Sequence, residues 1–246
     1  MKLGLMTPVM VLLGAFISGA YSVASQERVS VDIAQDPHHH ILLENQLVRV
    51  FAVAIPPHEE SYVRHERSFL AVTMKDGEIV MWRAGEADVM RVPTKQGDAR
   101  FFWGGFARGM RNESSAEYRS IMIEFLDPRV TTYAYQWQTG RWDYGSNVML
   151  RPVDPLARFV NQMDLEMAVV SDVQLLPKDS LDPPKTGGGE LVVAVTPVEL
   201  TSGSDTGTQL ASGEVLWLDH RLSKLVNVGA APARFTVIAF RPSGKP

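Results

Sequence analysis

The feature that constrains the fold most is a pattern of short strands that occurs twice along the chain. The halves match best at their ends, where Tyr118 to Phe125 and Arg234 to Phe240 are apolar runs that finish in Phe. An Asn precedes that Phe by the same interval in each half, as Asn112 and as Asn227. A constant offset indicates an internal duplication, so we expect two β-modules of about 100 residues each.

Each half consists of short apolar runs that are separated by turn residues. The run from Leu43 to Ile55 stops at Pro56-Pro57, and Phe69 to Met74 is followed by Lys75-Asp76-Gly77, a typical hairpin signal. Strands at spacings of about 8 to 12 residues with Gly, Pro and Asp between them are typical of sandwiches and barrels. The sequence therefore predicts an all-β fold. The predicted modules are residues 36–130 and 158–242, with a linker at 131–157.

The first 25 residues differ from the rest of the chain. Lys2 is the only charged residue before Glu27, the run from Leu3 to Ala20 is apolar apart from Thr7 and Ser18, and small residues follow it. This pattern predicts a cleaved secretory signal at residues 1–25, with an uncleaved membrane anchor as the alternative. We expect a periplasmic or secreted protein with no membrane contact after cleavage.

Composition excludes several classes of function. The chain has 24 Lys and Arg against 28 Asp and Glu, a formal net charge of -4, which argues against a nucleic-acid surface. It has no Cys, so disulfides, thiolate metal sites and catalytic thiols are excluded. A metal ion would need His, Asp, Glu or backbone oxygens as ligands.

Two stretches of the first half resemble a known family. Leu42 to Val50, then Pro56-Pro57 and Leu70 to Gly77, are similar to the opening of a cupin domain. Arg111-Asn112 and, in the second half, Val226 to Gly229 resemble the second cupin motif. The resemblance covers most of residues 40–128 and 158–241. It implies a bicupin, in which each half is a double-stranded β-helix, or jelly roll.

The resemblance also implies a ligand set. Cupins carry a His-x-His strand with a Glu four residues on, and one more His four residues before an Asn. His at i and i+2 and a Glu four further on share one face of a strand, so they converge inside the barrel. Together with the last His they hold iron, manganese, nickel or zinc with open positions.

In the first module, two registers place different residues at these positions. Without gaps, the His positions fall on Arg64 and Glu66, the Glu position on Leu70 and the last His position on Arg108. A one-residue slip puts His65 and Arg67 at the His positions and turns Arg64 and Glu66 outward. Arg cannot bind a cation, so either register removes the ordinary metal site.

The second module carries fewer candidate ligands. The corresponding positions are Pro184, Thr186, Glu190 and Ser223. One carboxylate with hydroxyl groups is a weak set for a transition metal. We therefore expect no metal cofactor in the ordinary positions of either module.

Other histidines offer further hypotheses. Strand alternation sends His38 and His40 of the His38-His39-His40 run to one face and His39 to the other, and the run precedes the first barrel strand, so we interpret it as a solvated edge. A displaced metal set could instead combine His65 with His58, Glu59 or Glu60.

The resulting hypothesis is an exported bicupin that binds a small molecule, anionic or derived from a sugar. In the gapless register, Arg64, Glu66 and Arg108 would line the barrel, with His65 beside them, and two guanidinium groups held by a carboxylate can grip an anion. The same cluster could be a structural ion-pair network. Glu190 and Ser223 are the candidates in the second module. The alternatives are a metal-dependent oxygenase, isomerase or lyase, and a structural homo-oligomer that pairs through strand edges.

Overall fold

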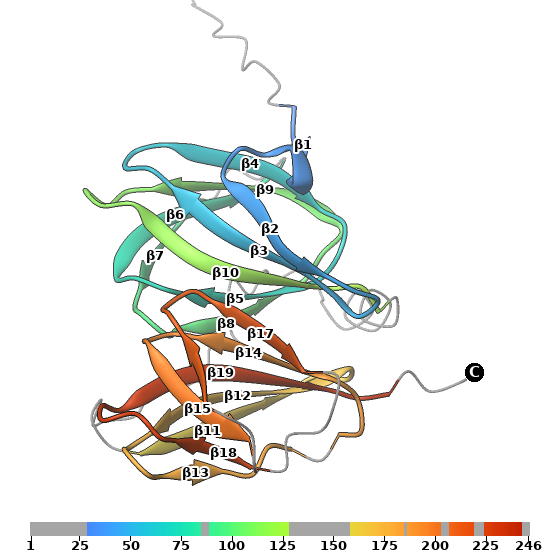
Figure 1. The fold of residues 1–246 in the computed structure, drawn as a ribbon. Helices are drawn as coiled ribbons and strands as arrows, with labels where there is room; N and C mark the ends of the chain where they lie inside the picture. The colour runs from blue at the N-terminus through green and yellow to red at the C-terminus, as the bar shows by residue number, and fades with distance from the viewer. Residues whose placement is uncertain are drawn as a thin grey trace, which may run out of the picture.

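In the computed structural model, the described residues form nineteen β-strands and one short 3-10 helix, η1 (Ile33–Gln35). The strands make two barrels that follow one another along the chain (Figure 1). The prediction of an all-β fold with two jelly-roll barrels is therefore confirmed. The structure describes residues 29–84, 89–127, 158–184, 186–202, 207–218 and 224–242.

The first barrel consists of two five-stranded sheets, with strand orders β1-β4-β9-β6-β7 and β2-β3-β10-β5-β8. Strands far apart in sequence are neighbours in both sheets, which is the jelly-roll arrangement. The strands are β1 (Val31–Asp32), β2 (His39–Glu44), β3 (Val48–Ile55), β4 (Glu60–His65), β5 (Phe69–Thr73), β6 (Gly77–Arg83), β7 (Val89–Thr94), β8 (Ala99–Phe102), β9 (Phe106–Asn112) and β10 (Tyr118–Phe125).

The second barrel repeats this arrangement with sheets β11-β12-β19-β14-β17 and β13-β18-β15-β16. The order β12-β19-β14 corresponds to β3-β10-β5 of the first barrel, and every pair is antiparallel. The strands are β11 (Phe159–Asp164), β12 (Ala168–Leu175), β13 (Ser180–Leu181), β14 (Glu190–Ala194), β15 (Val198–Ser202), β16 (Thr208–Leu210), β17 (Val215–Leu218), β18 (Leu225–Asn227) and β19 (Ala233–Phe240).

The two Asn residues that revealed the repeat hold equivalent turns. Asn112 donates through Nδ2 to the carbonyl oxygens of Ile55 (2.9 Å) and Ala116 (2.8 Å), and its Oδ1 accepts from Ser114 N. Asn227 makes the same three kinds of bond, to Leu175, Ala231 and Gly229. Both amides are buried, so each one satisfies backbone groups that water cannot reach. We name these two sets of bonds the Asn clasps.

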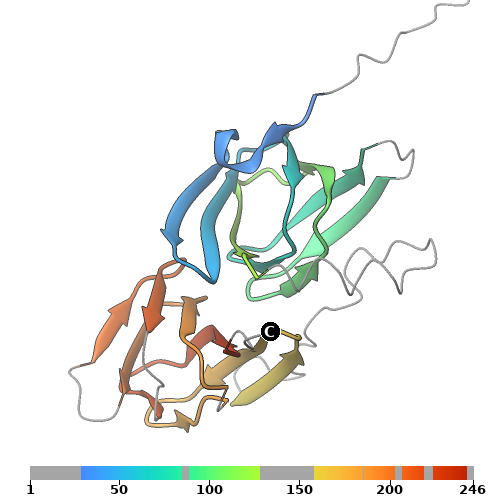
Figure 2. The same cartoon turned by 90° about the vertical axis from the view of Figure 1, so that its right-hand side faces the viewer.

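Alternation along the strands gives each inner sheet two different apolar faces. On β10, Tyr118, Ser120 and Met122 point into the first barrel, while Ile121 and Ile123 point toward the second barrel. The outward residues of β3, β5 and β10 and those of β12, β14 and β19 form one continuous core between the barrels. Figure 2 shows the first barrel above the second. Sheet packed on sheet therefore joins the two modules.

A buried ion pair lies at the rim of this contact. Arg234 Nη2 lies 3.1 Å from Asp172 Oδ2, and Arg234 Nη1 donates to the carbonyl oxygen of Gln96 in the first barrel at 2.9 Å. The Gln96 side chain donates to the carbonyl oxygen of Val195 at 3.1 Å. These polar contacts fix how one barrel sits on the other.

Two predicted segments remain outside the described residues, namely the signal peptide at 1–25 and the linker at 131–157. The first barrel begins with β1, which precedes the predicted boundary at residue 36. Within the part of the chain that the structure describes, no helix has the length and apolar character needed to cross a bilayer.

Candidate functional site

The first barrel contains a cavity between its two sheets. Its volume is about 50 Å³, and it is partly open to solvent. Most of the wall is apolar and comes from Val, Ile, Met, Ala and Phe side chains. The polar and aromatic-polar lining residues are His39, Ser61, His65, Arg108, Tyr118 and Ser120. A mainly apolar cavity with a few convergent polar groups is the usual form of a small-molecule site.

Strand β4 presents His65 to this cavity and turns Arg64 and Glu66 to solvent. His65 is buried, while the side chains of Arg64 and Glu66 are 54% and 61% exposed and form an ion pair with each other. The expectation that Arg64 and Glu66 line the barrel is therefore wrong. Because side chains alternate along a strand, either Val63 and His65 or Arg64 and Glu66 can face inward. Burying the charges of Arg64 and Glu66 would cost far more free energy than burying Val63 and His65.

His65 is a neutral, enclosed imidazole. Its ring stacks on Phe69 with the centroids 4.3 Å apart. Burial, and after it the positive charge of Arg108, holds the pKa of His65 well below its usual 6.5. Its Nδ1 atom is buried and has no hydrogen-bond partner among the described residues. Buried polar atoms are rarely left in this state, so we expect this nitrogen to have a partner beyond the described residues.

Arg108 brings a positive charge to the same cavity. It is buried on β9, and its Nη2 donates to the carbonyl oxygen of Trp103 at 2.6 Å. The guanidinium carbon lies 5.2 Å from the ring centroid of Phe102 and 5.1 Å from that of Phe106. These contacts hold the planar group in place. The structure thus places Arg108 in the cavity wall, and its role in binding stays a prediction.

A second histidine faces the cavity, and the sequence interpretation missed it. His39 on β2 is buried, so the solvated-edge interpretation is wrong for this residue, although His40 beside it is exposed. His39 Nδ1 lies 2.9 Å from Asp36 Oδ2, and Ser61 Oγ donates to the same carboxylate oxygen. The sequence shows only that Asp36 precedes His39 by three residues; the face that His39 uses depends on the pairing of β2 with β3.

Asp36 is the ionised centre of this group. Burial alone would raise its pKa, but the hydrogen bonds from His39 and Ser61 lower it to about 2. The amide of His38 also donates to its Oδ1 atom at 3.3 Å. Asp36 therefore stays a carboxylate at any physiological pH.

The cavity does not carry the donor set of a metal site. The inward positions with the His-x-His, Glu and His spacing are Val63, His65, Phe69 and Arg108, the last four residues before Asn112. Only one of these can donate a lone pair to a cation, and a guanidinium repels it. The displaced set also fails, because His58, Glu59 and Glu60 are exposed. Among the described residues, no group of three or more His, Asp or Glu could hold an ion.

The interior of the second barrel is different in kind. Leu175, Leu181, Val192, Phe235 and Val237 pack there in one apolar cluster. Glu190 is buried on β14, where it shares the inward parity of Val192 and Ala194. Ser223 lies outside the described residues, so its predicted role is untested there.

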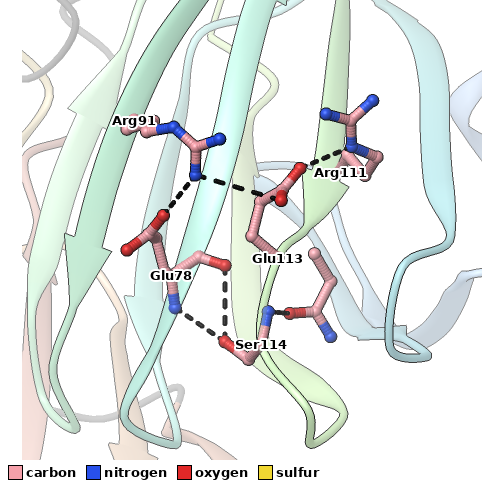
Figure 3. Close-up of polar contacts among 6 residues, drawn as sticks. Glu78, Arg91, Arg111, Glu113 and Ser114 are labelled. Atoms are coloured by element: carbon pink, nitrogen blue, oxygen red, sulfur yellow. Dashed lines mark hydrogen bonds and ion pairs between the residues drawn. The ribbon is translucent and has the colours of Figure 1, made fainter.

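The second-motif residues Arg111, Glu113 and Ser114 form a separate network away from the cavity (Figure 3). Arg111 Nε donates to Glu113 at 2.6 Å, and Arg91 lies 2.6 Å from Glu78 and 3.9 Å from Glu113. Ser114 Oγ accepts from the amide of Glu78 at 2.7 Å. These contacts join neighbouring strands, so we assign the network to the sheet and not to the site.

Comparison with known proteins gives likeness in structure only. No family profile matches the sequence, and no curated protein matches it either. A cupin 2 conserved barrel domain protein from Leptotrichia buccalis is 12% identical, with TM-score 0.52, and covers 87% of this chain and 92% of its own. Bacillus subtilis oxalate decarboxylase, described with Mn(II) centres, is 12% identical, with TM-score 0.55 and coverage of 89% and 79%. Salicylate 1,2-dioxygenase from Pseudoaminobacter salicylatoxidans is 13% identical, with TM-score 0.53 and coverage of 79% and 69%.

Proposed function

We propose that this chain, which has the bicupin fold, binds a small organic anion inside its first barrel. The observation that carries the proposal is the buried Nδ1 of His65, which has no partner among the described residues and lines the same cavity as the Arg108 guanidinium. An anion that accepts from Arg108 could also complete the hydrogen bonding of His65 Nδ1.

The wall of the cavity indicates the rest of the ligand. Phe69, Phe102, Met81 and Met122 surround the charged corner, so the ligand needs a compact apolar or aromatic body. A carboxylate matches the planar fork of Arg108 better than a neutral polar group does. The proposed ligand class is therefore a small carboxylate with an apolar body, and the proposed setting, from residues 1–25, is outside the cytoplasm.

The metal-dependent enzyme remains the second candidate only through the fold. Oxalate decarboxylase and salicylate 1,2-dioxygenase share this architecture. The inward residues of this chain replace the expected ligands by Val63, Phe69 and Arg108, so no observation on its own residues favours that chemistry.

Isothermal titration calorimetry with benzoate tests the binding proposal, with benzamide as the neutral comparison. Wild-type protein should bind benzoate more tightly than benzamide. Arg108→Met should weaken benzoate binding by about tenfold or more, because a charge-assisted hydrogen bond is lost. Ser120→Phe should abolish binding by filling the cavity.

The matched control is Arg64→Ala, since Arg64 is an exposed arginine on the neighbouring strand. It should leave benzoate binding unchanged. Equal affinities for benzoate and benzamide, or binding that survives Ser120→Phe, would show that the first barrel is not an anion site.

A further inference from the structure

Ser61, Asp36 and His39 are linked by hydrogen bonds that the binding of an anion to Arg108 does not require. Asp36 and His39 are both buried, and their side chains are only 5% and 3% exposed. Asp36 accepts from His39 Nδ1, from Ser61 Oγ and from the amide of His38. A buried carboxylate with this many donors is fixed in position, and it fixes the imidazole in turn.

The hydrogen bond to Asp36 also sets the tautomer of His39. An ionised carboxylate can only accept, so Nδ1 must carry a proton, and in the neutral ring Nε2 then carries the lone pair. His39 lines the cavity, and Nδ1 is the nitrogen held by Asp36, so Nε2 is the nitrogen left for a ligand. This is the arrangement of an oriented general base.

The two cavity histidines have different surroundings. His65 lies beside Arg108, whose charge opposes its protonation, whereas His39 is hydrogen-bonded through Nδ1 to the Asp36 carboxylate. His39 is therefore the one of the two histidines whose ring is oriented by a carboxylate.

The topology places these groups on opposite walls. His39 is on β2, in the sheet that contains β3 and β10, whereas His65 and Arg108 are on β4 and β9 of the facing sheet. His39 and Arg108 therefore line the same cavity from different sheets.

We propose that His39, oriented by Asp36 and Ser61, is a catalytic base that moves a proton on a small 2-oxo carboxylate bound in the first barrel, without a cofactor. The proposal rests on the anion site proposed above. His39 Nε2 takes a proton from the carbon next to the carbonyl. The C–H bonding pair becomes the C=C bond of an enolate, and the carbonyl π pair moves onto oxygen, where Arg108 stabilises the charge. Return of the proton from the imidazolium restores the ketone.

Deuterium exchange provides the direct test. Phenylpyruvate and 2-oxobutyrate are incubated with the full chain in D₂O, and ¹H NMR follows loss of the proton next to the carbonyl. Wild-type protein should exceed the buffer rate. His39→Gln should lower this excess rate by about 100-fold or more, and Asp36→Asn should lower it strongly while the affinity for the ligand persists. The matched control is His40→Gln, because His40 is exposed on the same strand.

A second measurement needs no variant and no turnover. Diethyl pyrocarbonate transfers a carbethoxyl group to an imidazole nitrogen that has a free lone pair. Tandem mass spectrometry of the His38-His39-His40 peptide should show modification of His39 that benzoate prevents, while modification of exposed His40 is not prevented. A purely structural His39 would stay unmodified whether or not benzoate is present.

The outcomes separate the two proposals. If calorimetry shows that phenylpyruvate binds but exchange equals the buffer rate, or if exchange persists in His39→Gln, the catalytic role is overturned and the anion site stands. If benzoate and both oxo acids fail to bind, the anion site is overturned, and the catalytic role of His39, which depends on that site, is overturned as well.

Discussion

The two barrels have the same strands and different interiors. Strands β10 and β19 both have eight residues and both follow an Asn clasp, yet the position that is Ser120 in the first barrel is Phe235 in the second. Ser120 lines the cavity, while Phe235 is fully buried among aliphatic side chains. One position of the repeat thus shows how the first barrel keeps a cavity while the second is packed with apolar side chains.

A buried carboxylate is placed differently in the two copies. In the first barrel Glu124 pairs with Phe69 across β10 and β5, and in the second Ala239 pairs with Glu190 across β19 and β14. Each barrel therefore has one Glu at this pair of positions, on opposite strands. The two barrels thus share their strand arrangement but carry the buried Glu on different strands, as expected when function depends on the site and not on the fold.

The largest effect on stability should come from removing a buried ring from the interior of the second barrel. Phe235→Ala should lower the free energy of unfolding by about 4 kcal/mol, because it removes a fully buried ring and leaves a cavity. Ser120→Ala in the first barrel should cost about 1 kcal/mol, since it removes a small group at a cavity wall. Chemical denaturation of both variants measures the difference, and similar losses in the two barrels would contradict the comparison.

The next effect should depend on pH and arises from Glu124. Burial raises the pKa of Glu124 from 4.5 to about 7, with Asp32 and Glu44 adding to the increase and Arg49 and Arg67 opposing it. Between these two values the folded state keeps a proton that the unfolded state loses, so stability falls as pH rises through the window. Below pH 4.5, Glu124 is protonated in both the folded and the unfolded state, so its ionisation no longer affects stability.

Glu124→Gln removes this penalty. At pH 8 the variant should be more stable than wild type by up to about 3 kcal/mol, and at pH 4.5 or below the two should differ little. Thermal unfolding at both pH values tests this. A stability difference that is the same at pH 4 and pH 8 would show that Glu124 ionises as easily in the folded as in the unfolded chain.

The Asn clasps should respond alike in the two barrels. Asn112→Ala and Asn227→Ala each leave two carbonyl oxygens and one amide without their partner, so each should cost about 2 kcal/mol. The measurement is chemical denaturation of the two variants side by side. A loss confined to one barrel would mean that the clasps are not equivalent.

Much of the fold was readable from the sequence, because the clasps and strand ends are local signals. The interval from Asn112 to Phe125 equals that from Asn227 to Phe240, and this equality predicted the duplication. The cavity was less readable, because it depends on which face of each strand turns inward. His39 could not be assigned without knowing that its strand pairs with β3 and closes over the barrel.

The error on strand β4 has a simple physical origin. A gapless count from Pro56-Pro57 assigns Arg64 and Glu66 to the interior, and a shift of one residue reverses every side chain. The sequence of this stretch indicates which residues face the interior, because Tyr62, Arg64 and Glu66 alternate with Ser61, Val63 and His65. Charged residues on one parity indicate the solvent face.

The smallest expected effect separates the two faces of β4. Arg64→Ala, Glu66→Ala and the double variant should each change stability by about 0.5 kcal/mol or less, because an exposed ion pair is screened by water. His65→Ala, between them, should weaken benzoate binding while leaving the outer pair intact, because His65 alone of the three lines the cavity. Calorimetry on the three single variants tests this. Loss of binding in Arg64→Ala or Glu66→Ala, with His65→Ala unaffected, would show that the anion binds at the outer face of β4. It would then contradict the proposal that the first barrel differs from the second by a binding cavity.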